Sequence, residues 1–198
     1  MNIFDFYKCK IKKDISLFIK HILINHKNYH YIIQDDISPV YHSAHIDWMK
    51  REKERLYTIL SEKTTLPVHY MSIMKDVHKE AIRGITYVGE KEGKDRWQSS
   101  TETWEKRTGD CEDIAIVIYR KLRDLGFPEW STYVCIVKGH AFAIVRPHRE
   151  ATNFWILDNG KITISIKKAF DVLQYYDYTP LYVFNEKSMW NVFTKEIG

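Results

Sequence analysis

The hydrophobic residues of this chain change their spacing close to residue 126, and this change constrains the fold more than any other feature. Before it, apolar side chains recur every three or four positions, as at Ile114, Ile118 and Leu122, which predicts an amphipathic helix. Gly126 and Pro128 predict the end of that helix. Beyond them, apolar and polar residues alternate as in β-strands. Helices followed by an antiparallel sheet define the α+β class, which is the predicted fold class.

The same spacing rules predict the other elements of the chain. Helical spacing occurs near residues 15–23, at 47–62 and at 70–88, where Gly84 predicts the helix end. Period-two segments predict strands at 132–138, 140–146, 154–157, 161–166 and 181–184, with a hairpin turn at 158–160. No Gly-, Pro- or Ser-rich linker divides the chain. We therefore expect a helical N-terminal extension at residues 1–46 and one domain at residues 47–198.

Length and composition exclude several classes of protein. The chain has 198 residues, of which 44% are hydrophobic, so it can bury a core without disulfides and is not disordered. Its three cysteines, Cys9, Cys111 and Cys135, form no CxxC pair, which argues against a zinc ribbon or a disulfide framework. The net charge of +4 does not indicate a nucleic-acid-binding protein, and only a lysine cluster within residues 8–13 favours that alternative.

The sequence also bears on the cellular compartment. No run of 18 apolar residues predicts a membrane-spanning helix. The first 20 residues carry charges within their apolar pattern and lack a small-residue cleavage site, so we expect no secretory signal. These observations favour a cytoplasmic or virus-encoded protein over a periplasmic one.

Cys111 is the residue with the clearest chemical potential. It lies at the predicted N-terminus of a helix, where unpaired N–H groups and the helix dipole stabilise a thiolate. His140 begins a predicted strand and Asp158 follows another, so the sheet could hold both side chains at a cleft. A nucleophilic cysteine needs an imidazole as base and a carboxylate to orient that base. The alternative is that all three are ordinary structural residues: a small buried thiol, a strand-edge histidine and a turn aspartate.

Acidic residues flank Cys111 at positions Asp110, Glu112 and Asp113. They can cap the predicted helix and complement its dipole. Three carboxylates near a thiolate also raise its pKa, which opposes activation of the cysteine. We therefore expect a cation to offset them, either protonated His140 or Ca²⁺, for which carboxylate oxygens are suitable ligands. Asp110 and Glu112 point to different sides of the helix end, so one of them could bind such an ion.

Four segments of the sequence follow one another along the chain: DRWQSSTETWEKRTGDCEDIAIVIYRKL around Cys111, GHAFAIV around His140, WILDN around Asp158, and PLYVFNEKSMW near the C-terminus. In this order they resemble the corresponding segments of bacterial transglutaminase-like cysteine proteinases of the LapG type. The resemblance implies a papain-like, transglutaminase-core fold in which the nucleophile helix packs on an antiparallel sheet. It also implies that Cys111 is the nucleophile, His140 the base and Asp158 the residue that orients the base.

The resemblance implies further site residues. Asp110 and Glu112 correspond to acids that bear on calcium in this family, whose best-known members are periplasmic proteases that cleave large adhesins near paired alanines. Trp97 lies where a tryptophan often occurs near the oxyanion site. With the backbone N–H of Cys111 as one oxyanion donor, Trp97 or Gln98 would be the second, although Trp97 could equally provide hydrophobic cover. Because we expect no secretory signal and match residues 1–46 to no counterpart in the family, the adhesin substrate is not carried over.

The predicted function is hydrolysis of peptide bonds through a thioester acyl-enzyme on Cys111. The chemistry requires no cofactor, but calcium could bind beside the cysteine. The expected partner is a protein or peptide substrate, with no nucleic acid and no membrane span. Two alternatives stay open: acyl transfer to an amine, as in transglutaminases, and a non-catalytic protein-binding module on the same fold.

Overall fold

The computed structural model describes residues 28–33, 43–56, 63–89, 96–149, 151, 154–158, 166–168 and 180–197. Its helices are α2 (Ser43–Leu56), α3 (Tyr70–Gly84), α4 (Ser100–Lys106), α5 (Cys111–Asp124) and the 3-10 turn η1 (Glu129–Ser131). Its strands are β1 (Asn28–Ile33), β2 (Thr86–Tyr87), β3 (Thr108–Gly109), β4 (Thr132–Val137), β5 (His140–Val145), β6 (Trp155–Leu157), β7 (Ile166–Lys168), β8 (Pro180–Phe184) and β9 (Met189–Ile197). The predicted α+β class is confirmed.

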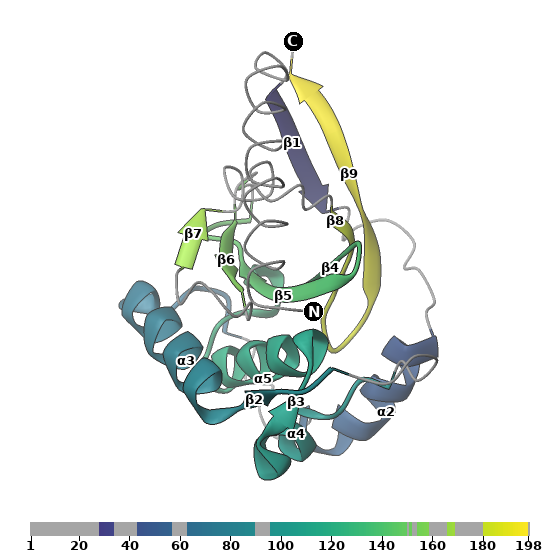
Figure 1. Ribbon diagram of the computed structural model, residues 1–198. Coiled ribbons are helices and arrows are strands. Elements are labelled where there is room, and N and C mark those ends of the chain that lie inside the picture. Colours follow the sequence, from purple (N-terminus) through teal and green to yellow (C-terminus); the bar gives the residue numbers. More distant parts are fainter. Residues whose placement is uncertain are drawn as a thin grey trace, which may run out of the picture.

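Seven strands form one antiparallel sheet in the order β1-β9-β8-β4-β5-β6-β7. At its centre, β4 and β5 are joined by a two-residue turn in which Gly139 has a φ of 73°, a conformation that favours glycine. The first residues of β9 pair with β8 and its later residues pair with β1. The β1–β9 ribbon therefore extends away from the rest of the sheet (Figure 1). Strands β2 and β3 form a separate short parallel pair.

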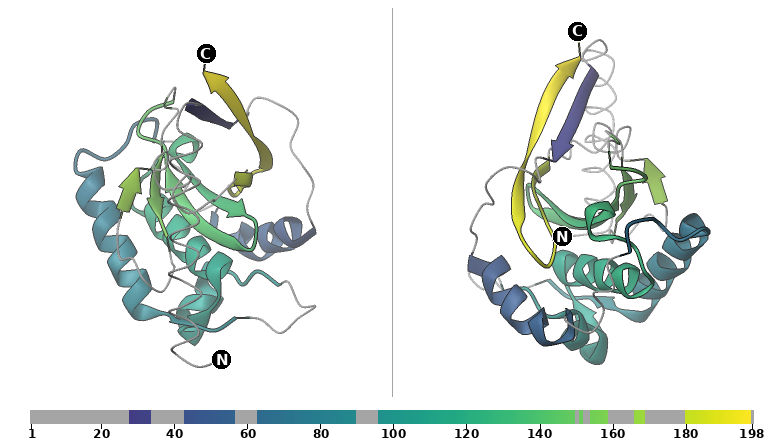
Figure 2. Two further views of the ribbon diagram at one scale, coloured as in Figure 1. Left: turned by 45° about the horizontal axis from the view of Figure 1, so that its top comes forward. Right: turned by 180° about the vertical axis from the view of Figure 1, so that it is seen from behind.

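Helix α5 lies between the sheet and the other helices (Figures 1 and 2). Its predicted apolar stripe is confirmed, because Ile114, Ile118 and Leu122 are all buried. They form one core cluster with residues of α3 and with Ala143 and Val145 of β5. Helix α5 therefore packs against β5, the strand that begins with His140.

A second and a third apolar cluster complete the core. On another side of α5, Tyr119 packs with Trp48 of α2 and Phe184 of β8. The third cluster contains side chains of β4 and β5 that point away from Ala143, including Cys135 and Phe142. The central strands are therefore buried on both faces. Burial also raises the pKa of the Cys135 thiol, which disfavours the reactive thiolate form.

The N-terminal part of the chain departs from the sequence prediction. Within residues 1–46, predicted to be a helical extension, residues 28–33 form strand β1, and α2 begins at Ser43, before the predicted Asp47. The sequence NYHYII contains aromatic and β-branched residues that suit a strand, but its partner β9 lies at the other end of the chain. The helix predicted near 15–23, the lysine cluster at 8–13, Cys9 and the turn residues Asn159 and Gly160 lie outside the described residues.

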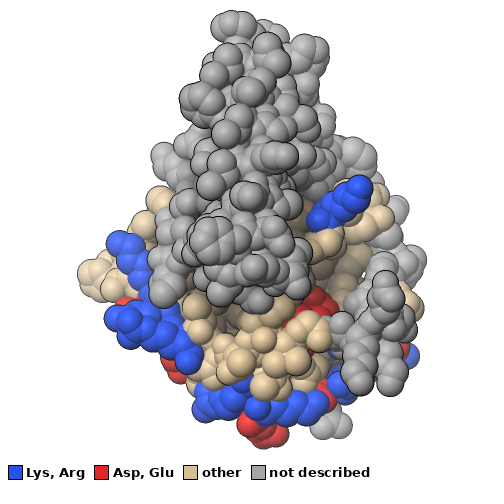
Figure 3. Space-filling model, in the orientation of Figure 1, with Lys and Arg blue, Asp and Glu red and all other residues tan. Residues whose placement is uncertain are grey.

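The described surface carries charges of both signs. Figure 3 shows Lys and Arg side chains along the lower part of the molecule, over α3 and α4, with Asp and Glu side chains among them. Among the described residues, no helix is long and apolar enough to span a membrane.

Candidate active site

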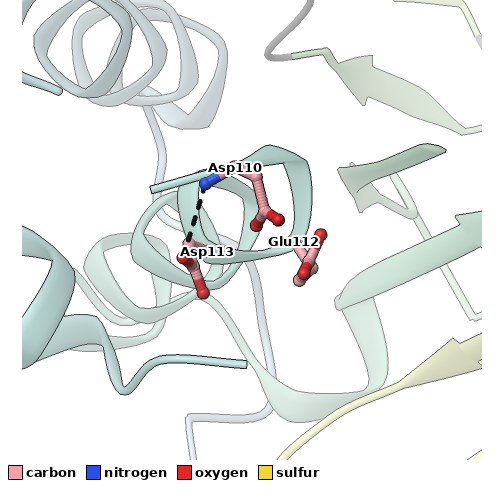
Figure 4. Close-up of side chains that lie close together, drawn as sticks. All are labelled: Asp110, Glu112 and Asp113. Carbon is pink, nitrogen blue, oxygen red and sulfur yellow. Dashed lines mark hydrogen bonds between the residues drawn. The ribbon is translucent and has the colours of Figure 1, made fainter. Parts of the chain in front are cut away.

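The N-terminus of α5 is held by the carboxylate of Asp113, which folds back over the first turn. Asp113 Oδ2 accepts a hydrogen bond from the Asp110 N–H at 3.4 Å, and Oδ1 accepts one from the Gln98 N–H at 2.7 Å (Figure 4). A Cβ atom at Gly109 would lie 2.6 Å from the Asp113 Cβ. Only glycine therefore fits at this position, which gives a physical reason for the order Gly-Asp-Cys-Glu-Asp at the start of the helix.

Cys111 is the first residue of α5 and is only partly buried. Its Sγ lies 3.1 Å from Glu112 Oε2, to which the thiol donates. The pKa of Cys111 is strongly raised, first by burial, then by the charge and hydrogen bond of Glu112 and by the charge of Asp110. A hydrogen bond from the backbone N–H of Ala141 to the sulfur acts in the opposite direction. Because Ala141 follows His140 directly, this contact places the thiol beside the first residues of β5.

His140 and Asp158 form the clearest polar contact of the site. His140 Nε2 lies 2.7 Å from Asp158 Oδ1, and the two side chains are 18% and 14% exposed. The tight turn at Gly139 places His140 at the start of β5, while Asp158 directly follows β6, the neighbouring strand. The structure thus brings together the predicted base and the carboxylate predicted to orient it.

Trp97 and Gln98 lie on the segment that precedes α4. The ring of Trp97 stacks on Phe184 with 4.8 Å between centroids and is 4% exposed, as expected for hydrophobic cover. Gln98 Nε2 donates to Asp113 Oδ2 at 2.5 Å and to the Thr108 carbonyl at 3.3 Å. These bonds use the amide hydrogens that an oxyanion would need, so the side chain of Gln98 anchors the N-terminus of α5.

Asp110, Glu112 and Asp113 bring one carboxylate oxygen each within 4.8 Å of the others (Figure 4). Burial is the main cause that raises the pKa of Glu112 and of Asp113. Hard carboxylate oxygens at this separation fit a Ca²⁺ ion. Asp113 already accepts hydrogen bonds from Asp110 and Gln98, and the Asp110 and Glu112 carboxylates face each other in Figure 4. Asp110 and Glu112, the two residues predicted to bear on calcium, both belong to this acidic cluster.

Tyr87 is a residue near the site that the sequence analysis missed. It belongs to β2, where it pairs with Gly109 immediately before the α5 N-terminus. Its pKa is raised by burial and then by the charges of Cys111, Asp110 and Glu112, so its side chain lies close to these groups. A two-residue parallel strand gives no periodic signal, and the sequence therefore could not indicate this proximity.

In its fold, the chain is similar to bacterial transglutaminase-like cysteine proteinases. The solved structures that match include LapG of Legionella pneumophila, with 26% identity over 76% of this chain and 80% of LapG, and a TM-score of 0.55. Calcium-bound LapG matches with 26% identity over 76% and 81% of the two chains, and a TM-score of 0.52. EGTA-treated LapG matches with 23% identity over 78% and 87%, and a TM-score of 0.55. No protein-family profile and no curated protein matches the sequence significantly.

These matches confirm the resemblance expected from the four sequence segments. They support a cysteine peptidase at the level of the family. The calcium-bound LapG structure, together with the acidic cluster of this chain, makes a calcium site plausible.

Proposed function

We propose that this protein is a cysteine peptidase that hydrolyses peptide bonds with Cys111, His140 and Asp158. The observation that carries the proposal is the 2.7 Å contact between His140 Nε2 and Asp158 Oδ1, next to a cysteine at a helix N-terminus. A carboxylate bonded to one ring nitrogen fixes the tautomer of the imidazole and stabilises its protonated form. The similarity to LapG supports the assignment to the cysteine peptidases as a class.

The geometry suggests how the reaction proceeds. Because Asp158 bonds Nε2, His140 would use Nδ1 to take the proton of the Cys111 thiol. The sulfur attacks the peptide carbonyl, the C–N bond breaks, and His140 returns the proton to the leaving amine. Water, deprotonated by His140, then hydrolyses the thioester. The backbone N–H of Cys111, at the first position of α5, would be one donor to the oxyanion.

The acidic side chains beside Cys111 need to be offset for this mechanism to operate. The Cys111 thiol donates to Glu112, and burial together with the charges of Glu112 and Asp110 raises the pKa of the thiol, which disfavours the thiolate. Asp110 and Glu112 would hold a Ca²⁺ ion, with Asp113 keeping the helix cap in place. The bound ion would neutralise the negative charge next to the sulfur. Glu112 would then no longer compete for the proton that His140 must receive.

The proposal also covers the domain organisation. We assign residues 47–198 to the peptidase domain, since they contain every candidate site residue. Residues 1–46 would form an addition to this domain, and the pairing of β1 with β9 supports a structural contact between the two.

A digest of a proteome-derived peptide library tests the proposed function. The library is incubated with the protein in 1 mM CaCl₂ or in EGTA, and new peptide ends are identified by mass spectrometry. We expect cleavage that is lost in Cys111→Ala and kept in Cys135→Ala, because Cys135 is buried in the core. Cleavage by Cys111→Ala would show that the nucleophile has been assigned incorrectly.

A labelled primary amine, added to the same reactions, separates the two enzymatic alternatives. Its incorporation into peptides in a Cys111-dependent manner would favour acyl transfer, whereas cleaved ends without incorporation favour hydrolysis. If neither product forms but peptides are retained by the immobilised protein, the chain is a binding module.

A further inference from the structure

His78 is a buried histidine of α3 that has a direct contact with the candidate active site. Its side chain is 1% exposed, and its Nε2 lies 2.7 Å from the backbone carbonyl oxygen of Asp158. A carbonyl oxygen can only accept, so His78 Nε2 carries a hydrogen and donates it. The bond joins residues 80 positions apart in the sequence, on a helix and at the end of a strand.

The position of Asp158 explains why such a bond matters. Asp158 directly follows Leu157, the last residue of β6, which pairs with Ala143 of β5 and with Ile166 of β7. His78 donates to the main chain of Asp158, and the Asp158 carboxylate in turn bonds His140 at 2.7 Å. A continuous series of hydrogen bonds therefore runs from α3 through Asp158 to the imidazole.

We propose that His78 is a positioning residue of the active site, which acts on His140 through Asp158. This inference rests on the proposed function, because it assigns His78 a role in the same reaction. The His78 bond fixes the main chain of Asp158, and the carboxylate is thereby held in the orientation that the imidazole of His140 requires. A displacement of about 1 Å in a catalytic group can reduce the rate by about 100-fold, so a single buried hydrogen bond can have a large effect.

The chain provides a matched control in His45 of α2. Its side chain is 2% exposed, and its Nε2 lies 2.9 Å from the backbone carbonyl oxygen of Asn185, which directly follows β8. Both histidines are buried and both bond a backbone carbonyl through Nε2. Only the acceptor of His78 belongs to the candidate active site, so the pair separates a catalytic effect from a loss of stability.

The experiment measures hydrolysis of p-nitrophenyl acetate in 1 mM CaCl₂, with the rate of Cys111→Ala subtracted as background. Steady-state turnover requires deacylation of Cys111 by water, a step in which His140 acts as base. The variants are His78→Leu, His78→Gln, His45→Leu and His45→Gln, each with its unfolding free energy measured in urea. Glutamine can place an amide N–H close to the position of the imidazole Nε2, whereas leucine has no donor.

We expect His78→Leu to lower kcat by about 10- to 100-fold with KM changed less than twofold, and His78→Gln to recover most of kcat. Both His45 variants keep kcat within twofold of wild type, although His45→Leu loses stability. A His78→Leu variant with wild-type kcat would overturn the inference, as would an equal loss of kcat in His45→Leu. If His78→Leu does not fold, His78→Asn replaces it, since its shorter side chain cannot reach the carbonyl, and the same loss is expected.

The assay also separates this inference from the proposed function. If wild-type protein turns over no faster than Cys111→Ala, the proposed function fails and the role of His78 fails with it. If turnover depends on Cys111 but not on His78, only the present inference is overturned.

Discussion

The two ends of helix α5 differ in how their charged side chains are arranged. At the C-terminal end, Arg123 Nη2 lies 2.6 Å from Glu186 Oε1, and Arg120 Nε lies 2.9 Å from Asp124 Oδ1. At the N-terminal end, three carboxylates gather within 4.8 Å of one another beside Cys111. The first arrangement pairs charges of opposite sign, whereas the second concentrates charge of one sign. Such concentration is typical of functional sites, because it shifts pKa values and attracts cations. The same helix therefore has one end at which opposite charges are paired and one end at which acidic side chains gather beside the proposed nucleophile.

The largest expected effect on stability comes from removing the ion pair at the C-terminal end of α5. Arg123→Leu removes the cation that pairs with Glu186, a side chain that is only 3% exposed. Burial already raises the pKa of Glu186 to about 7, so loss of the cation favours the protonated carboxyl, and we expect the free energy of unfolding in urea to fall by about 3 kcal/mol. The protein that remains folded should keep its Cys111-dependent activity.

The double variant Arg123→Leu with Glu186→Leu is the control for this prediction. It replaces the whole ion pair by apolar groups, which is often close to neutral in stability, so it should recover most of the loss. A single variant as stable as wild type would show that the C-terminal end does not depend on this pair.

Calcium should have the next largest effect, and it should act at the N-terminal end alone. A ligand present at about 100 times its Kd stabilises the native state by about 2.7 kcal/mol. We expect CaCl₂ to raise the unfolding free energy of wild type by this order, and Glu112→Gln to lose most of that increase. In EGTA, Glu112→Gln should be more stable than wild type by about 1 kcal/mol, because one of two close carboxylate charges is removed.

Glu105→Gln provides the control for the calcium experiment, since Glu105 is exposed on α4, outside the acidic cluster. It should respond to calcium as wild type does. Equal stability of wild type in CaCl₂ and in EGTA would contradict the calcium site.

Gly109→Ala tests whether the N-terminal end of α5 depends on the close packing of Asp113 against Gly109. The new Cβ would lie 2.6 Å from the Asp113 Cβ and 2.8 Å from its Oδ2, so the carboxylate that caps the helix must move. We expect a loss of about 1–3 kcal/mol in unfolding free energy, together with a loss of Cys111-dependent activity. At Gly89, the added Cβ would meet only the Tyr87 ring among the described residues, at 3.8 Å. Gly89→Ala should therefore be neutral, and equal effects at both glycines would count against a special role for Gly109.

The comparison also shows which parts of the molecule the sequence could predict. The apolar stripe of Ile114, Ile118 and Leu122 was predictable because helical burial repeats over short distances. The pairing of β1 with β9 was not, because the two strands lie at opposite ends of the chain and local spacing carries no information on such partners.

The candidate site divides in the same way. Residue types and their order predicted that His140 and Asp158 would meet, and the structure places them 2.7 Å apart. The use of Gln98 was not predictable, since an amide can serve an oxyanion or a helix cap equally well, and only the position of Asp113 decides between them. For the same reason, His78 could not be distinguished from an ordinary residue of an amphipathic helix.

The smallest expected effect concerns a carboxylate that has the opposite environment to those beside Cys111. Glu102 of α4 accepts hydrogen bonds from Arg96 at 2.9 Å and from Lys106 at 2.7 Å. These bonds, those of Arg96 first, lower the pKa of Glu102 to about 2. Since the folded pKa lies below the unfolded value of 4.5, the contribution of Glu102 to stability is present above pH 4.5 and is lost as the pH falls toward 2. Because Glu102 is partly exposed and the side chains of Arg96 and Lys106 are about half exposed, solvent screens these pairs and we expect a contribution of less than about 1 kcal/mol.

Urea unfolding of Glu102→Gln at pH 3 and at pH 7 measures this contribution. The variant should be less stable than wild type at pH 7, and the difference should be smaller at pH 3 and in 1 M NaCl, because salt screens exposed ion pairs. A deficit of the same size under all three conditions would mean that Glu102 acts through packing. In that case Glu102 would differ from the carboxylates beside Cys111 in its burial, and the nearby cations would not account for its effect on stability.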